Sequence, residues 1–229
     1  MHYLSKKLCV LIFVCASGLQ AEPITLGVPQ LKPFTYLEDG EIKGSVIDPI
    51  VEALKQSQTE YTFKFIENYS GLLKATRNNE IDGFFVATKN IERDKIAVFS
   101  KPVFIDKYTW FMLNDATYEF GSDEFMYDAK VGAVINTNSF RLATRRGYFV
   151  VGLPSEELAQ RFINRNLDAV FATYSSFKYQ LDTQGIPSKR YRVINDSKRP
   201  FGVYISKHYL RKHPGFMKIL NRQIKTKKN

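Results

Sequence analysis

The chain has 229 residues and a formal net charge of +10, with 33 lysines and arginines against 23 aspartates and glutamates; this length allows one or two domains. The basic residues are scattered and become dense only in the C-terminal "KILNRQIKTKKN", while the aromatic residues lie in apolar runs. Nucleic-acid-binding proteins concentrate basic residues in a stripe with exposed aromatics, so we expect no nucleic-acid partner.

Residues 1–21 have the features of a secretory signal peptide. Lys6 and Lys7 form a positive start, "LCVLIFVCA" is an apolar stretch, and the small residue Ala21 precedes the expected cleavage site. The alternative, an uncleaved membrane anchor, would need about 20 apolar residues. Both cysteines lie in this segment, so the exported chain would depend on apolar burial instead of disulfides. The sequence therefore predicts a soluble periplasmic protein.

The first half of the exported chain alternates between predicted strands and helices. Apolar and β-branched runs predict the strands, and apolar residues at helical spacing predict the helices. In chain order we expect strand 24–28, helix 47–55, strand 61–67, helix 70–79 and strand 81–87. This order favours a mostly parallel sheet covered by helices.

The same alternation restarts after an aromatic strand at 107–113. A serine typical of helix starts, Ser155, and a helix-ending glycine, Gly147, help to set the bounds. We expect strand 130–135, helix 139–147, strand 148–153, helix 155–166 and strand 167–173. A strand at 201–206 and a helix at 213–224 close the chain.

The two halves also resemble each other in sequence. "NEIDGFFVAT" and "RNLDAVFATY" align Asp82 with Asp168 and Phe85 with Phe171. The alignment indicates either a duplicated unit or the general similarity of helix-to-strand junctions. In both cases two β/α units joined by a central strand predict two lobes, with a ligand crevice at the ends of parallel strands.

Directed polar side chains follow the last strand of the first half. Asn90 is a good helix cap, which places Arg93 at the third helical position, where it could reach back beside Thr88. A guanidinium is a rigid two-pronged donor, so this group is suited to a planar carboxylate. The alternative is a surface turn in which Arg93 pairs with Glu92 or Asp94.

These motifs resemble a known family along nearly the whole exported chain. "ITLGV", "GEIKGSVIDPIVEAL", "EIDGFFVATKNIERDKIAVFSKPVF", "KVGAVINTNS" and "PFGVYISK" occur in the order and spacing of the family-3 extracellular solute-binding proteins. These are the polar amino-acid receptors of bacterial ABC importers. The most specific part is Thr88-x-Asn90-x-Glu92-Arg93 followed by "FSKPVF".

The resemblance implies an α/β fold of the type II periplasmic-binding-protein kind, in which each lobe is a mostly parallel sheet flanked by helices and two hinge strands join the lobes. The implied organisation is a signal peptide at 1–21, lobe 1 at 22–106, a hinge strand plus lobe 2 at 107–199, and a return to lobe 1 with a C-terminal helix at 200–229. The implied partners are a small anionic or zwitterionic solute and an inner-membrane ABC permease, and we expect a monomer.

The resemblance also implies the site residues. The family's carboxylate-clamping arginine falls on Arg93 and its hydroxyl partner on Thr88. The lobe 2 loop that contacts the carboxylate, usually Gly-Thr-Thr, falls on Asn136, Thr137 and Asn138. The remaining candidates are the cap and the cleft wall, namely Asn90, Tyr69 and Phe34.

Several positions depart from the family pattern. The acid that commonly holds the ligand's α-ammonium falls on Thr173, and the aromatic that often stacks on the ligand falls on Leu31. Asp48 or Asp168 could supply an acid, although a helix start and a strand start favour structural roles. Since a desolvated ammonium without a counter-charge is costly, we expect a carboxylate or other small polar solute as well as an amino acid.

Two other functional classes are compatible with this fold. A lyase or dehydratase on this fold would need a positioned acid or base. Histidines in the exported chain occur only at 208 and 213, and no nucleophile arrangement, metal-ligand cluster or phosphate-binding loop is evident. We therefore expect no enzyme, no metal and no cofactor. A ligand sensor or partner-binding protein that uses the same fold without feeding an importer remains the alternative.

Overall fold

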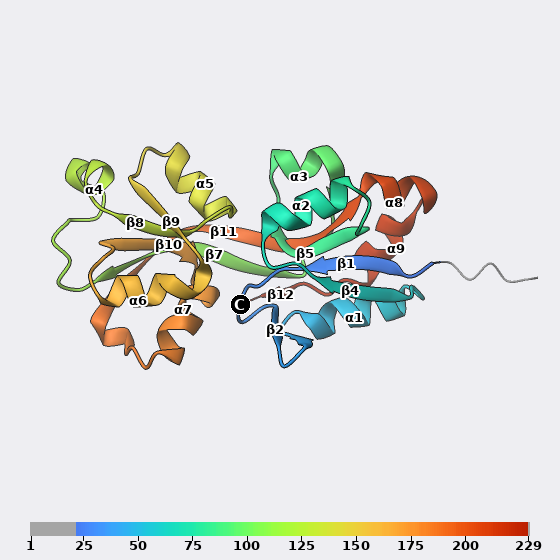
Figure 1. Cartoon of the computed structure of the whole chain (residues 1–229), viewed down its shortest axis with the longest axis horizontal. Helices are drawn as coiled ribbons and strands as arrows, with labels where there is room; N and C mark the ends of the chain where they lie inside the picture. Colours follow the sequence, from blue (N-terminus) through green and yellow to red (C-terminus); the bar gives the residue numbers. More distant parts are fainter. Residues whose placement is uncertain (1–21, 229) are drawn as a thin grey trace, which may run out of the picture.

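The computed structural model describes residues 22–228, so the predicted signal peptide lies outside the described residues. The protein has two lobes joined by two long strands, as predicted (Figure 1). These hinge strands are β7 (Phe104–Leu113) and β11 (Tyr191–Ser206). They pair with each other antiparallel from Phe104–Phe201 to Leu113–Tyr191.

Lobe 1 contains both ends of the described chain. Its larger strands are β1 (Ile24–Val28), β4 (Tyr61–Phe65) and β5 (Gly83–Thr88). Its short strands are β2 (Tyr36–Glu38), β3 (Glu41–Lys43), β6 (Ala97–Phe99) and β12 (Lys227–Lys228). Its helices are α1 (Ile47–Gln56), α2 (Tyr69–Arg77), α3 (Ile91–Ile96), α8 (Lys207–Lys212) and α9 (Phe216–Gln223).

Lobe 2 is built from one continuous segment between the hinge strands. Its strands are β8 (Val131–Val134), β9 (Val150–Leu153) and β10 (Ala169–Thr173). Its α-helices are α4 (Asp123–Tyr127), α5 (Asn138–Arg145), α6 (Leu158–Ile163) and α7 (Tyr174–Thr183). Two 3-10 turns, η1 (Ser155–Glu157) and η2 (Ser188–Arg190), complete it.

The strands of both lobes form one continuous sheet in the order β4-β1-β5-β11-β7-β10-β8-β9. Within lobe 1, β1 is parallel to β4 and β5, and within lobe 2, β8 is parallel to β9 and β10. The hinge strand β7 runs antiparallel to β10, and β11 runs antiparallel to β5. Each lobe therefore contains the parallel sheet that the sequence predicts, and the carboxyl ends of β5 and β10 are brought toward the junction.

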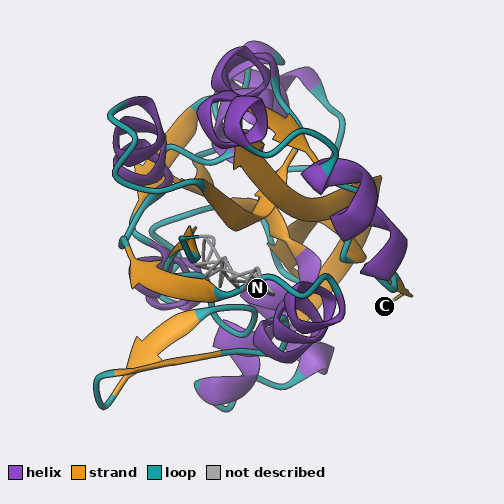
Figure 2. Ribbon diagram, turned by 90° about the vertical axis from the view of Figure 1, so that its right-hand side faces the viewer, coloured by secondary structure: helices purple, strands orange, loops and turns teal. Residues whose placement is uncertain are grey.

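Helices cover both faces of the sheet in each lobe, as the view from the lobe 1 end shows (Figure 2). In lobe 1, one apolar cluster packs α1 and α9 on one face, and a second packs α2 on the other. In lobe 2, Trp110 lies among Phe120, Phe125, Tyr148 and Phe171 on one face. The opposite face packs α6 and α7. Within residues 22–228, no helix is long and apolar enough to span a membrane.

The aligned aspartates of the two halves make the same contacts. Asp82 accepts a hydrogen bond from Thr25 N at 2.9 Å, and Asp168 accepts one from Lys130 N at 2.8 Å. In each case the aspartate N–H also donates to the carbonyl of the same partner. Asp168 thus holds the start of β8, a structural role, and the sequence similarity of the halves reflects one geometry used twice.

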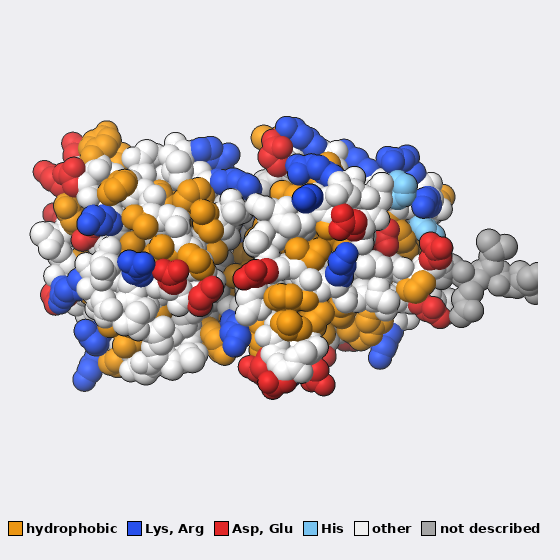
Figure 3. Space-filling view, in the orientation of Figure 1, with side chains coloured by type: hydrophobic (Ala, Val, Ile, Leu, Met, Phe, Trp, Pro, Cys, Tyr) orange, Lys and Arg blue, Asp and Glu red, His pale blue; other side chains and the backbone are white. Residues whose placement is uncertain are grey.

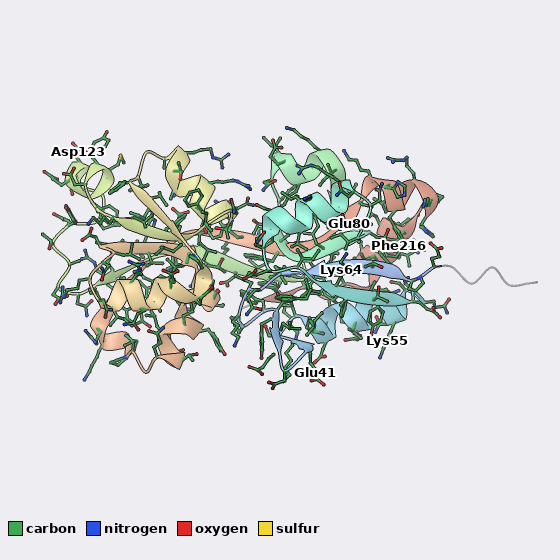
Figure 4. All side chains as sticks on the ribbon, viewed as in Figure 1. Glu41, Lys55, Lys64, Glu80, Asp123 and Phe216 are labelled. Carbon is green, nitrogen blue, oxygen red and sulfur yellow. The ribbon has the colours of Figure 1, made fainter. Side chains whose placement is uncertain are left out.

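An ion pair on the outer surface of lobe 1 is exposed to solvent. Lys64 on β4 and Glu80, before β5, lie near each other in Figure 4 and form an ion pair at 3.7 Å. Both side chains are about half exposed, and such pairs contribute about 0–1 kcal/mol. The stability of the lobe therefore depends on its apolar clusters, as expected for a segment that contains no cysteine.

Three local predictions were incomplete or wrong. Ser155 does not cap an α-helix, because it lies in a 3-10 turn and its hydroxyl accepts from Gln180 Nε2 at 3.1 Å. Helices α4, α7 and α8 were not predicted. The final strand extends from Tyr191, because its polar first part pairs with β7 as a hinge strand instead of lying in a core.

Candidate functional site

A cavity lies between the lobes beside the carboxyl ends of β5 and β10. Its volume is about 30 Å³, counted as the space open to the centre of a water molecule. By this measure one water needs about 10–15 Å³, so the lobes are closed onto a space too small for an amino acid. The cavity is lined by Leu31, Tyr69, Thr88, Arg93, Tyr108, Val134, Thr137, Asn138, Ser139, Leu158, Ala172, Thr173, Ser176, Phe177, Gln180 and Phe201.

Arg93 enters this cavity from α3. As predicted, Asn90 caps the helix: its side-chain oxygen accepts from Arg93 N at 2.8 Å. The third helical position directs the arginine back over the end of β5, where Nη1 donates to the Thr88 carbonyl at 2.6 Å. The guanidinium also lies over the Tyr69 ring, 4.6 Å from its centroid. Only 1% of Arg93 is exposed.

The charge of Arg93 has no counter-charge in the part of the chain that the structure describes. No ion pair is formed by this residue there, and its Nε is buried without a hydrogen-bond partner. It is also the sole charged side chain among those that line the cavity. Burial lowers the pKa of Arg93, but an arginine in a protein stays protonated. An isolated buried cation is costly, so the cavity is electrostatically suited to an anion.

The backbone of β5 is strained next to the arginine. Val86 has φ of 59°, which is unusual for a β-branched residue. The β5–β11 register also shifts at this point, between Gly202 and Tyr204. The Tyr69 hydroxyl donates to the Val86 carbonyl and so holds the distorted strand end. Backbone strain of about 1–3 kcal/mol is concentrated at functional sites in many proteins.

Replacing Tyr69 with phenylalanine should therefore destabilise the protein. The Val86 carbonyl would remain buried without its donor, and we expect the free energy of unfolding to fall by about 1–2 kcal/mol. Urea unfolding followed by circular dichroism measures this change. Tyr127→Phe is a matched control, because Tyr127 is 65% exposed. Equal unfolding midpoints for wild type and Tyr69→Phe would contradict the role given to this hydroxyl.

Asn138 joins the two lobes across the cavity. It is the first residue of α5, after the Thr137 cap whose hydroxyl accepts from Phe140 N at 3.3 Å. Its Nδ2 donates to Thr88 Oγ1 at 2.5 Å, and its Oδ1 accepts from Asn90 Nδ2 at 2.6 Å. These contacts hold lobe 2 against the Thr88–Arg93 segment of lobe 1.

A further hydrogen bond between the lobes comes from α7. The Ser176 hydroxyl donates to the Lys32 carbonyl, which follows β1, at 2.7 Å. The lobes are therefore held by few polar contacts besides the hinge strands, and a solute larger than water requires these contacts to open.

Replacing Asn138 with alanine should shift the unliganded protein toward an open form. The loss of two short inter-lobe hydrogen bonds corresponds to about 1–3 kcal/mol. Small-angle X-ray scattering should show a larger radius of gyration for the variant. Asn166→Ala is the control, since Asn166 is an exposed lobe 2 residue away from the cavity. An unchanged radius of gyration would show that Asn138 does not hold the lobes together.

The structure brings most of the predicted site residues together. Those that line the cavity are Tyr69, Thr88, Arg93, Thr137, Asn138 and Thr173. Asn90 lines a neighbouring cavity. Phe34 does not line the cavity, because it stacks on Phe104 at 4.6 Å in the lobe 1 core, and Leu31 lines the cavity instead.

Asn136 has a backbone role in the structure. Its φ of 63° lies in the left-handed region, which asparagine tolerates better than most residues. This explains how asparagine can stand where the resemblance implies a glycine. Its side chain is not among those lining the cavity.

Sequence reasoning missed polar residues on α7. Ser176 and Gln180 lie one helical turn apart, four residues along, and both line the cavity. Gln180 Oε1 is buried and has no hydrogen-bond partner among the described residues. If a helix had been predicted directly after the strand at 167–173, Ser176 and Gln180 would have been placed beside the carboxyl end of that strand. Tyr108, on the hinge strand, was missed because its aromatic neighbours indicated only a core.

Among residues 22–228, no acid lines the cavity. Thr173, at the position of the family's acid, is 9% exposed and uncharged. Asp48 and Asp168 are both absent from the lining. Among residues 22–228, no three His, Cys, Asp or Glu side chains are grouped to hold a metal ion. The geometry thus offers a fixed positive fork and hydroxyl and amide groups, but no carboxylate.

The sequence matches no protein-family model and no curated protein significantly. Solved structures do match. The arginine-, lysine- and histidine-binding protein ArtJ of Geobacillus stearothermophilus has a TM-score of 0.73 and 18% identity, with 89% of this chain and 88% of that chain covered. The GluR0 ligand-binding core of Nostoc punctiforme, in complex with L-glutamate, has a TM-score of 0.73 and 15% identity, with 88% and 91% covered.

A histidine kinase sensor domain, described as similar to periplasmic binding proteins, has a TM-score of 0.75 and 12% identity, with 89% of each chain covered. Together these similarities establish the fold: the chain has the two-lobed architecture of the periplasmic binding proteins. The neighbours include an amino-acid-binding protein, a ligand-binding core and a sensor domain.

Proposed function

We propose that the protein is a solute-binding receptor that captures a small carboxylate-bearing solute between its lobes. The observation that carries this proposal is Arg93, a fully buried cation with no counter-charge among the described residues and a free Nε in an inter-lobe cavity. A carboxylate accepts two parallel hydrogen bonds from a guanidinium. Thr88 and the Asn138 amide supply further polar groups at the same place.

The binding mechanism is lobe closure around the solute. In an open form, Arg93 and Thr88 of lobe 1 receive the carboxylate. Lobe 2 then closes and brings the α5 start, with Thr137 and Asn138, onto the other side. The closed unliganded cavity has room for about two waters, so the solute must displace the Asn138 contacts. Binding thus shifts an open–closed equilibrium by its differential affinity for the two forms.

The residues that line the Arg93 cavity limit which chemical classes of solute it can bind. Since no acid of the described part of the chain lines the cavity, an α-ammonium would have to use uncharged acceptors. Gln180 Oε1 is one such buried acceptor without a partner among the described residues, and Thr173 also lines the cavity. A simple carboxylate needs neither. We therefore propose a carboxylate as the first candidate and an amino acid, held at Gln180, as the second.

We propose that the protein belongs to the family-3 solute-binding proteins and delivers its solute to an ABC importer in the inner membrane. The motif around Arg93 supports this assignment, as does the similarity to ArtJ and to the substrate-binding protein of an amino acid ABC transporter, with 19% identity and a TM-score of 0.70. The expected location is the periplasm, and the expected form is a monomer without catalytic activity or cofactor.

A sensory role is the second candidate function. The similarity to a histidine kinase sensor domain and to a glutamate-receptor core favours it. The same closure would then report the solute to a signalling partner instead of a permease. Deletion of the gene distinguishes the two roles: loss of solute uptake indicates transport, whereas normal uptake with altered transcription indicates sensing.

Two measurements test the binding function. Mass spectrometry of the protein purified under native conditions identifies a retained solute. A thermal-shift screen then compares small carboxylates, amino acids, neutral solutes and cationic amines. We expect carboxylates to raise the unfolding temperature. A screen in which only uncharged or cationic solutes stabilise the protein would overturn the proposal.

A further inference from the structure

A second cavity adjoins the Arg93 cavity at the junction of the lobes. Its volume is about 400 Å³, and the two cavities share Thr88, Tyr108 and Asn138 as lining residues. Residues from both lobes and from both hinge strands surround this outer cavity. They are Thr88, Lys89, Asn90, Ile91, Glu92, Tyr108, Asn138, Arg141, Leu142, Arg145, Arg199 and Pro200.

The lining of the outer cavity is strongly positive. Its cations are Lys89 from lobe 1, Arg141 and Arg145 from α5, and Arg199 from the hinge strand β11. Figure 3 shows Lys and Arg side chains over α5 and over α3, on the two sides of the gap between the lobes. The one acid in the lining, Glu92, forms an ion pair with Lys95 at 2.7 Å.

The arginines of this cavity lack acidic partners. Within residues 22–228, Arg141, Arg145 and Arg199 form no ion pair. By contrast, three other arginines of lobe 2 each pair with a carboxylate: Arg146 with Asp196, Arg161 with Glu157 and Arg165 with Asp115. The cavity therefore gathers three arginines that form no ion pair with any acid among residues 22–228.

Two of these guanidinium groups also have buried, unused donors. Arg141 Nη1 and Arg199 Nε are inaccessible to solvent and have no hydrogen-bond partner among the described residues. Arg199 is held over the Tyr108 ring, 4.9 Å from its centroid. Unsatisfied buried donors are uncommon in folded proteins, and both belong to guanidinium groups that line the cavity.

The positive field extends across both cavities. Burial, and to a smaller extent the charge of Arg141, lowers the pKa of Arg93. The Lys95 hydrogen bond, and to a smaller extent Arg141, lowers the pKa of Glu92. Asn138 stands between the cavities, since it lines both and holds the Thr88 hydroxyl. When the lobes separate and Asn138 withdraws, the two cavities become one site with cationic groups at both ends.

We infer that the outer cavity is a second anion-binding subsite, so that the solute carries two anionic groups, one for Arg93 and one for Arg141 and Arg199. This inference rests on the proposed function, because it places the first anionic group at Arg93. The chemical class is a small dianion, a dicarboxylate or a phosphorylated carboxylate. Neither type of second group is favoured over the other by guanidinium chemistry, since both accept paired hydrogen bonds.

Calorimetry with matched pairs of solutes tests the inference. The pairs are butyrate and succinate, alanine and aspartate, and serine and O-phosphoserine, which differ by one anionic group. For at least one pair, the wild type should bind the dianionic member about tenfold or more tightly. The double variant Arg141→Gln/Arg199→Gln should lose most of this preference, and each single variant should lose part of it. Arg161→Gln removes one positive charge, as each single variant does, but from an exposed position of lobe 2. It should keep the preference for the dianionic solute.

The outcomes separate this inference from the proposed function. If the wild type binds both members of every pair equally, or if the double variant keeps the preference, the second subsite is excluded while the Arg93 site stands. If the wild type binds no member of any pair, the proposed carboxylate site fails, and the subsite fails with it. Thermal unfolding of each variant verifies that it is folded, and the single variants supply the result if the double variant is not.

Discussion

Replacing Arg93 with alanine should weaken binding of a carboxylate solute by about 2–5 kcal/mol, which corresponds to roughly 30-fold or more in affinity. The reason is geometric as well as electrostatic. Arg93 is buried, its fork is fixed by Thr88 and Tyr69, and it is the sole charge in the cavity lining. Isothermal titration calorimetry with a solute identified in the screen measures the loss.

Two further variants sharpen this test. Arg93→Lys keeps the charge but has no planar fork, so we expect an intermediate affinity. Arg161→Ala removes an exposed charge that pairs with Glu157 and should bind normally. Carboxylate binding to Arg93→Ala at wild-type affinity would refute the assignment of the site.

Replacing Arg93 with methionine should stabilise the unliganded protein while it abolishes anion binding. Methionine has a similar length and fills the space without a desolvated charge. Substituting apolar residues for buried charged groups has been neutral or stabilising by about 1–4 kcal/mol. We expect a gain toward the lower end, because the contacts with Thr88 and the Tyr69 ring are lost. Urea unfolding without ligand measures the difference.

A decrease in the free energy of unfolding would change the interpretation of Arg93. If Arg93→Met lowers the free energy of unfolding by several kcal/mol, the guanidinium would be a structural element whose present contacts compensate its burial. Arg161→Met is the control for effects of methionine on expression and solubility, since Arg161 is about half exposed. Stability gained together with binding lost is the signature of a functional residue.

Most of the fold could be predicted from local patterns. Strands such as β1 and β5 are continuous apolar runs, and α5 ends before Gly147 as its sequence indicates. The hinge part of β11 could not be read this way. It is polar from Asn195 to Arg199, and only its pairing with β7 makes this part a strand. Residues 174–183 were missed because their apolar and polar positions form no strong helical face.

The candidate site was predicted in part for a similar reason. Thr88, Asn90 and Arg93 lie within six residues of each other, so capping and strand-end arguments place them together. Arg199 and Gln180 reach the site from distant parts of the chain, through hinge pairing and the position of α7. Such groups carry no local signal. The resemblance supplied the lobe 2 loop, and the structure gave Asn136 a backbone role and Asn138 an inter-lobe role.

Lobe 2 is one uninterrupted stretch that leaves lobe 1 along β7 and returns along β11, its direct neighbour. Half of the binding surface is therefore encoded in a single cassette. Exchanging that cassette between related receptors at the paired positions Lys107 and Lys198 would require only two junctions. Ligand selectivity that depends on α5 and α7 would be transferred with lobe 2. The Arg93 site belongs to lobe 1 and would remain that of the protein that receives the new lobe 2.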